Sequence, residues 1–120
     1  MGSRRLLDTN VVSRFLMGDS EDRAKLAGRL LAAGDAGELT LVMLPEVMAE
    51  CVCVLESFYE HSREHIARVF GELVRSVGVE LGGLEVHLDA LASYGRTKVR
   101  YVDCVIAATA WGEWLAGGDV

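Results

Sequence analysis

The sequence has one proline, three cysteines and no apolar run that approaches the roughly 18 residues of a membrane-spanning helix. The single proline and a charged fraction of 25% argue against a disordered chain. The N-terminal arginine pair is followed by only two leucines before Asp8, which does not favour a signal peptide. Because Cys51, Cys53 and Cys104 lie among apolar residues, we expect buried, reduced thiols in the cytoplasm, with neither a disulfide framework nor a zinc site.

Basic residues are also scarce. Twelve lysines and arginines stand against 18 aspartates and glutamates, which gives a net charge of −6. This balance argues against binding of nucleic acid through a broad basic surface. It leaves room for an enzyme that acts on nucleic acid, because a metal ion can screen acidic residues locally. The 120 residues contain no linker and no internal repeat, so we expect a single domain spanning 1–120.

Short apolar segments alternate with helical patterns along the chain. Strands are expected at 4–7, 39–44 and 79–81, and the continuous run 39–44 is typical of a strand buried on both faces. Each strand precedes two predicted helices. These helices are 10–17, a second between a cap at Asp19 or Ser20 and a stop at Gly34 or Gly37, 45–58, a fourth between Ser62 and Gly78, 84–94, and 101–115. Strands that alternate with helices indicate an α/β fold around a parallel sheet.

The apolar spacing in two of these helices predicts which face each one buries. In the helix 45–58 the expected face is Val47, Cys51, Val54, Leu55 and Phe58. In the helix after Ser62 it is Ile66, Val69, Phe70, Leu73 and Val77.

Three carboxylates lie among apolar neighbours, unlike most acidic residues of the chain. Asp8 occurs in LLDTNVV, Glu50 in VMAECVCVL and Asp103 in YVDCVIAATA. A carboxylate in such surroundings is costly to desolvate unless it is paired or binds a metal ion. These three residues are therefore the first candidates for a functional site.

The predicted positions of the three carboxylates allow them to meet. Asp8 follows the first strand, and ligands of open parallel sheets bind at the carboxyl ends of the strands. Glu50 lies one turn from Val47 and from Val54, and Asp103 is in the first turn of the last helix. If that helix begins at the same edge of the sheet, the three oxygen ligands converge in a set suited to Mg²⁺ or Mn²⁺. The ordinary alternatives are a helix cap for Asp8, a solvated helix edge for Glu50 and a helix-dipole contact for Asp103.

Three segments together resemble a known family. Leu6-Leu7-Asp8-Thr9-Asn10, then residues 44–50 (LPEVMAE), then residues 101–107 (YVDCVIA) resemble in order the acidic motifs of PIN domains. The nearest subgroup is the VapC-type toxin of bacterial or archaeal toxin–antitoxin pairs. The resemblance implies a three-layer α/β/α sandwich with a central parallel sheet.

The resemblance also implies an activity, which is Mg²⁺- or Mn²⁺-dependent endoribonuclease cleavage of RNA. Asp8, Glu50 and Asp103 would then bind the metal. Asn10, or Thr9, would orient the first carboxylate or a water molecule bound to the metal. The implied partners are an RNA substrate, a second copy in a homodimer and a small cognate antitoxin, in the cytoplasm and with no membrane.

One feature of the family has no counterpart in this sequence. PIN domains usually carry a fourth acidic residue just after a further strand, and we expect that strand and residue to be missing here. Asp119 precedes the position and is not assigned the role. We therefore expect weak metal binding, and keep as an alternative a catalytically impaired PIN-fold module that acts through a protein partner. The substitution Asp8→Asn distinguishes the enzyme from the binding module, because only an enzyme would lose metal-dependent cleavage of RNA. We expect this substitution to leave folding intact.

A basic stretch precedes the segment that carries Asp103. Arg96, Lys98 and Arg100 could hold substrate phosphates, or they could form an ordinary solvated loop. Tyr94, Tyr101 and Trp111 could stack a base, although a place in the core or at an interface is the more ordinary role for such residues.

The histidines suggest a second chemistry. The segment 61–65 (HSREH) matches the inverted zinc-protease signature H-x-x-E-H. That mechanism needs both histidines on one helical face and a third ligand. Because Ser62 is the predicted N-cap, His61 falls outside the helix, and His87 lies on another helix. The sequence therefore favours a polar helix start over a protease.

Overall fold

Three parallel strands and six helices form the part of the chain that the computed structural model describes, which is residues 3–17, 21–58 and 61–115. The strands are β1 (Ser3–Leu6), β2 (Leu39–Met43) and β3 (Val79–Leu81), in the order β1-β2-β3. The helices are α1 (Thr9–Met17), α2 (Glu21–Asp35), α3 (Pro45–Phe58), α4 (Arg63–Arg75), α5 (Leu84–Arg96) and α6 (Tyr101–Leu115). The predicted α/β class, with two helices after each strand of a parallel sheet, is confirmed.

Most helix and strand boundaries lie within two residues of those predicted. The predicted N-cap at Ser62 is confirmed by its hydrogen bond. The Ser62 hydroxyl accepts a hydrogen bond of 3.1 Å from the His65 backbone N–H at the start of α4. The predicted cap at Asp19 or Ser20 lies outside the described residues. The predicted stop at Gly78 is too late, because α4 ends at Arg75 and the next residue already has an extended backbone.

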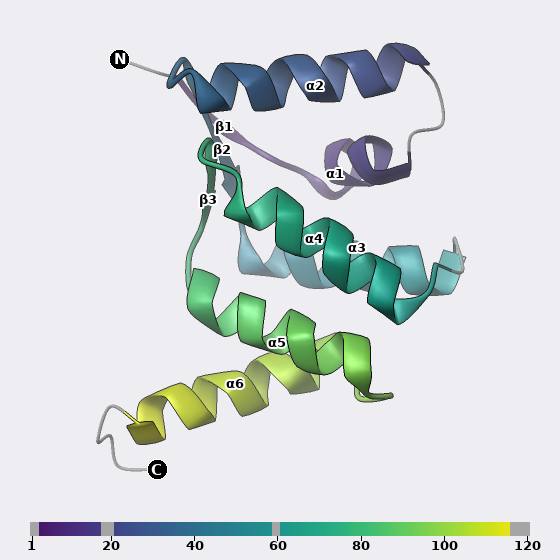
Figure 1. Cartoon of the computed structure of the whole chain (residues 1–120), viewed down its shortest axis with the longest axis vertical. Coiled ribbons are helices and arrows are strands. Elements are labelled where there is room, and N and C mark those ends of the chain that lie inside the picture. Colours follow the sequence, from purple (N-terminus) through teal and green to yellow (C-terminus); the bar gives the residue numbers. More distant parts are fainter. Residues whose placement is uncertain (1–2, 18–20, 59–60, 116–120) are drawn as a thin grey trace.

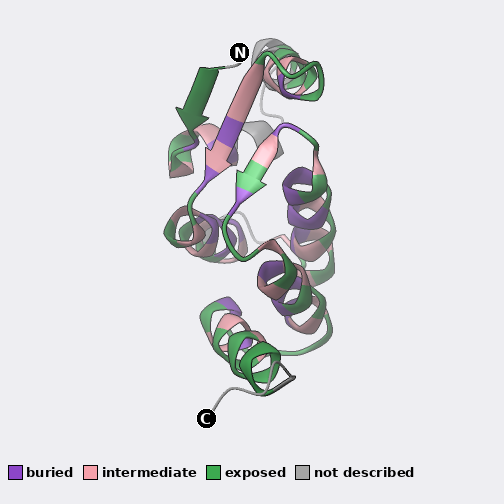
Figure 2. Cartoon of the chain, turned by 90° about the vertical axis from the view of Figure 1, so that its left-hand side faces the viewer, coloured by how far each residue is buried: buried purple, intermediate pink, exposed green. Residues whose placement is uncertain are grey.

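The two faces of the sheet have different surroundings. Leu41, Met43 and Leu81 share a buried face, because the register pairs Met43 with Leu81. The helices of Figure 1 lie on that side, and Figure 2 looks onto the other side. There Leu6 is 70% exposed, and Val42 beside it is half-buried. The expectation that 39–44 is buried on both faces is therefore met on one face only.

Helix α3 crosses the core, and the face it buries differs from the predicted one. Cys51 and Leu55 are buried as expected, whereas Val47 and Val54 are only half-buried. Among the other α3 side chains that the structure describes, Met48 and Val52 are buried, whereas Cys53, which was expected to be buried, is exposed. The predicted face residue Phe58 has a side chain that lies outside the described part of the structure. The shift arises because α3 contacts α1, α4 and α6, so neighbours on several sides decide which positions are covered.

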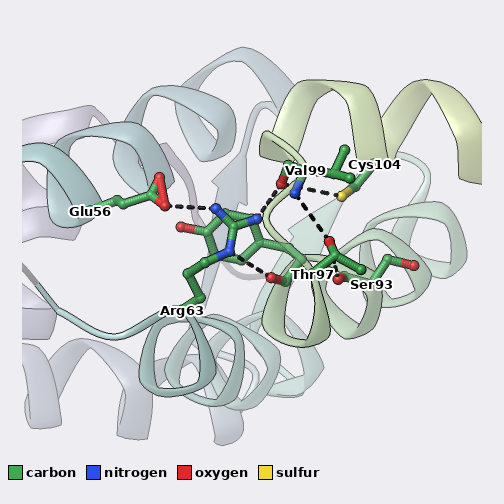
Figure 3. A network of polar contacts seen from close by, with 7 residues as sticks. Glu56, Arg63, Ser93, Thr97, Val99 and Cys104 are labelled. Carbon is green, nitrogen blue, oxygen red and sulfur yellow. Dashed lines mark hydrogen bonds and ion pairs between the residues drawn. The ribbon is translucent and has the colours of Figure 1, made fainter.

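A single arginine joins three elements around the end of α5. Arg63 forms an ion pair of 2.7 Å with Glu56 of α3, and its Nε donates to the Tyr94 carbonyl oxygen at 2.9 Å. Its Nη2 also donates to the Val99 carbonyl oxygen in the loop before α6. Figure 3 shows this network at the junction. The guanidinium carbon lies 3.8 Å from the centre of the Tyr94 ring, in a cation–π contact.

The last two helices extend away from the sheet. Helix α5 packs on α4 and α6 packs on α5, and both lie beyond the strands in Figure 1. Large apolar side chains of α6 remain on the surface, namely Val102, Ile106, Trp111 and Trp114. In the described part of the chain, no helix combines the length and the apolar character needed to cross a membrane.

A buried histidine joins α5 to α6 and makes stability depend on pH. His87 is 4% exposed, and its Nδ1 lies 2.6 Å from the Tyr101 hydroxyl oxygen. Burial lowers the pKa of His87 below its ordinary value of 6.5. The unfolded chain therefore takes up the proton first, and stability falls as the pH drops below about 6.5. We expect the melting temperature to fall by roughly 2–5 °C between pH 7.5 and 5.5. In His87→Gln this fall should largely disappear in scanning calorimetry, and an unchanged pH profile would contradict the assignment.

Candidate active site

Asp8 lies where β1 gives way to α1. The preceding residue, Leu7, is buried, and its N–H donates to the Val42 carbonyl oxygen at 2.9 Å, which fixes the chain at the end of the strand. One carboxylate oxygen of Asp8 accepts a hydrogen bond of 2.8 Å from the Val11 N–H, so this side chain caps α1. The residue is exposed, and the cap uses only one of its two oxygens. A helix cap and a ligand are therefore compatible roles for Asp8.

Glu50 reaches the same place from α3. Its Oε2 accepts a hydrogen bond of 3.0 Å from the Thr9 hydroxyl. Thr9 follows Asp8 directly, so this bond brings the second carboxylate to the start of α1. Asn10 or Thr9 was predicted to orient the first carboxylate, Asp8. In the structure the Thr9 hydroxyl instead contacts the second carboxylate, Glu50, and Asn10 is exposed on the next position of α1.

The Cys51 thiol lies next to this pair, and it donates to the Thr9 carbonyl oxygen at 3.9 Å. Cys51 is fully buried, and burial is the main reason why the pKa of its thiol rises to about 11. The negative charges of Glu50 and Asp8 add to that rise. The hydroxyl of Ser13, one turn along α1 from Thr9, is also buried, and its interaction with the Cys51 thiol lowers the pKa of that thiol. Sequence reasoning missed Ser13, although its spacing of four from Thr9 places both on one face of α1.

Asp103 lies elsewhere. It is in the first turn of α6, where its Oδ2 is 3.2 Å from Nε of Arg100. It borders a hollow between α5 and α6 that Ser93 and Trp111 also line. Among the described residues, no group of three or more His, Cys, Asp or Glu side chains could hold a metal ion. The structure thus brings Asp8 and Glu50 together without Asp103, whose role as a third ligand stays a prediction.

The other candidates are spread over the surface. Arg96 ends α5, and Lys98 and Arg100 follow it in the loop that leads to α6; all three are exposed. This position suits phosphate binding without demonstrating it. The rings of His61 and His65 stack with centroids 5.0 Å apart, away from the pair that His87 forms with Tyr101.

Comparison with known proteins decides the family. The family model described as PIN domain matches residues 5–113. The chain belongs to the PIN domain family. No curated protein and no solved structure matches it. PIN domains are generally nucleases that depend on a divalent metal. The match confirms the family resemblance and leaves the VapC-type subgroup as a proposal.

The oxygen atoms at the start of α1 fit the metal that PIN domains generally need. Mg²⁺ is often held by one or two carboxylates, with waters and substrate phosphates completing its octahedron. Asp8 and Glu50 supply two carboxylates of this kind, and both are held in place by hydrogen bonds. The donor set of this PIN domain therefore suits Mg²⁺ or Mn²⁺ and contains no soft ligand other than a buried thiol.

The hydrogen bond from Thr9 to Glu50 can be tested directly. Thr9→Val keeps the shape of the side chain and removes the donor, which frees the Glu50 carboxylate to move. Residues that orient a ligand typically contribute about 10–100-fold to metal affinity. We expect Thr9→Val to weaken Mn²⁺ binding to that extent in calorimetric titration, and Thr9→Ser, which restores a hydroxyl, to recover most of it. Equal affinities for both variants would show that the bond does not position Glu50.

Proposed function

We propose that this PIN domain is a divalent-metal-dependent ribonuclease that hydrolyses phosphodiester bonds of RNA. The observation that carries the proposal is the meeting of Asp8 and Glu50 through Thr9, in a chain of a family whose members are generally nucleases. The two carboxylates come from segments about 40 residues apart, and the fold brings them to the end of β1, the edge where open parallel sheets bind ligands.

Several residues of the chain would have separate roles in such a reaction. When bound, Mg²⁺ or Mn²⁺ would stabilise the negative charge that develops on the phosphodiester and would activate a water molecule. Asp8 and Glu50 would hold the cation, and the hydrogen bonds from the Val11 N–H and the Thr9 hydroxyl keep their carboxylates oriented. Asp103 is the family's third acidic position and could join them once its ion pair with Arg100 opens. An exposed ion pair of this kind contributes little free energy in water.

We further propose that the protein is the toxin of a VapBC-type pair, that it forms a homodimer, and that a small antitoxin binds it. The described structure supports a protein partner through α6, where Ile106, Trp111 and Trp114 are 61%, 54% and 59% exposed. A helix that is apolar on all sides is usually covered, and large exposed apolar patches mark interaction surfaces. Both partners remain part of the proposal.

The direct test is cleavage of a structured RNA by the purified chain. We expect cleavage in millimolar MgCl₂ or MnCl₂, none in EDTA, and recovery when excess metal is restored. Cleavage that persists in EDTA would contradict the metal-dependent mechanism. RNA that remains intact under all conditions would overturn the nuclease proposal and favour the alternative, a PIN-fold module that acts by binding a protein.

A further inference from the structure

Helices α5 and α6 form an antiparallel hairpin that is joined by the loop 97–100 (Figure 1). Two hollows of about 400 and 360 Å³ lie along the line where the helices meet. Both hollows are lined by Asp89, Ala108 and Trp111, so they form one continuous groove. We call the end of the hairpin near Glu85 the open end, and the end near the loop 97–100 the loop end.

The open end combines negative charge with exposed tryptophan. Glu85, Asp89 and Glu113 are exposed there, and none of the three forms an ion pair within the described part of the chain. The rings of Trp111 and Trp114 stack with their centroids 5.1 Å apart, and both remain exposed. Carboxylates and tryptophan rings both attract cations, so the open end is suited to lysine or arginine side chains.

The loop end carries the opposite charge. Arg96 and Lys98 are exposed, and neither forms an ion pair among the residues that the structure describes. Arg100 beside them is paired with Asp103. About 16 Å of helix separate Glu85 from Arg96, at about 1.5 Å per residue. This distance exceeds the Debye length of about 8 Å at physiological salt, so the two ends of one hairpin neutralise each other only weakly.

Much of α6 is apolar and uncovered. Val102, Ile106 and both tryptophans are exposed, and Figure 2 shows most of this helix, near the C-terminus, as exposed. A helix that is apolar on several sides is normally buried, so we expect a further layer on it. A second copy, related by a twofold axis so that the two hairpins run antiparallel, supplies that layer. It also places the loop end of each copy on the open end of the other, so the charges make the hairpin self-complementary.

We propose that two copies of this chain associate through the α5–α6 hairpin in this antiparallel arrangement. Arg96 and Lys98 of each copy contact the carboxylates of Glu85 and Asp89 and the ring of Trp111 in the other copy. The inference rests on the homodimer of the proposed function and names the surface that forms it. RNA does not suit the open end, because carboxylates repel phosphates. In this arrangement Arg96 and Lys98 bind protein carboxylates instead of substrate phosphates.

The first experiment measures the oligomeric state of the purified chain by sedimentation equilibrium in EDTA, where neither metal binding nor cleavage contributes. We expect a reversible dimer at micromolar concentrations. Because Trp111 and Trp114 are the only tryptophans of the sequence, their fluorescence should move to shorter wavelength as the dimer forms and they leave water. A chain that stays monomeric, or a dimer whose tryptophan emission is that of the monomer, would overturn the proposal.

Charge reversal tests the antiparallel arrangement. One protein carries Glu85→Lys and Asp89→Lys at the open end, and a second carries Arg96→Glu and Lys98→Glu at the loop end. Each protein alone places like charges at both contacts, so its dimer should be at least about 100-fold weaker. Mixed in equal amounts, the two proteins should form a heterodimer, because each contact then joins opposite charges again. Reversed proteins that do not associate on mixing would overturn the proposal.

The matched control combines Asp35→Lys with Glu72→Lys. Both residues are exposed on other helices, α2 and α4, and the net charge changes by the same amount as in the open-end variant. The control should dimerise within about threefold of the original affinity. A dimer that the reversed proteins keep as well as the control does would place the interface elsewhere and refute this inference. Cleavage of RNA is measured separately: a dimer that does not cleave refutes the nuclease alone, and a monomer that cleaves refutes this inference alone.

Discussion

Asp8→Asn is expected to abolish metal-dependent cleavage of RNA, with a fall in rate of at least roughly 100-fold, and to leave the fold intact. Asparagine keeps the oxygen that accepts the Val11 N–H, and it caps helices about as well as aspartate does. The substitution removes the negative charge that would hold the cation beside Glu50. It also relieves repulsion between two neighbouring carboxylates in the metal-free protein. The melting temperature should therefore stay the same or rise slightly.

The measurement is the initial rate of RNA cleavage in MgCl₂ or MnCl₂, together with a thermal melt of each protein. Asp35→Asn is the matched control, because Asp35 is an exposed aspartate at the end of α2, and both rate and stability should stay at the original values. An Asp8→Asn protein that cleaves RNA at the original rate would remove Asp8 from the site. A melting temperature lowered by more than about 5 °C would show that asparagine does not replace the cap.

The sequence singles out Asp8 and Glu50 because each lies among apolar residues, where a desolvated carboxylate would be costly. In the structure both carboxylates are exposed, so desolvation is not the reason for their positions. The contacts that bring them together could not be predicted. The cap to Val11 and the bond from Thr9 depend on how α1 meets α3. Asp103 shows the same limit, because its position in the first turn of α6 is local, while its distance from the other acids depends on how α6 docks.

The fold shows a similar division between local and tertiary information. Helices and strands follow from periodicity and turn residues, so their order along the chain was predicted. Val77 extends the apolar spacing of α4, yet it is 84% exposed because the helix has already ended. Gly78 was predicted only as a helix stop. In the structure a Cβ there would lie 2.2 Å from the Cα of Gly34, so the glycine is needed for close contact between two backbones.

Arg63 is the clearest case of a residue whose importance is invisible in the sequence. It occurs in the polar stretch HSREH, where a solvated charge is the ordinary interpretation. In the structure it binds Glu56 and the carbonyl oxygens of Tyr94 and Val99, so it ties α3, α5 and the loop before α6 together (Figure 3). Tyr94 and Val99 are 31 and 36 residues away, and Glu56 lies on the preceding helix, so no spacing rule within one helix predicts these contacts.

We therefore expect Arg63→Ala to lower the free energy of unfolding by about 2–4 kcal/mol. The loss has three sources: the two carbonyl oxygens lose a donor, the Glu56 carboxylate loses its ion pair, and the Tyr94 ring loses the cation stacked on it. Arg63→Lys should recover part of this free energy, because an ammonium keeps the charge but cannot reproduce the planar fork. Urea denaturation measures the free energy of unfolding of the original protein, of Arg63→Ala and of Arg63→Lys.

The matched control is Arg68→Ala, an exposed arginine on the same helix whose contact is with His65 one turn away. Its loss should change the free energy of unfolding by less than about 0.5 kcal/mol. If Arg63→Ala and Arg68→Ala are equally stable, the network does not hold the helices together. The position of Glu56 would then need another explanation.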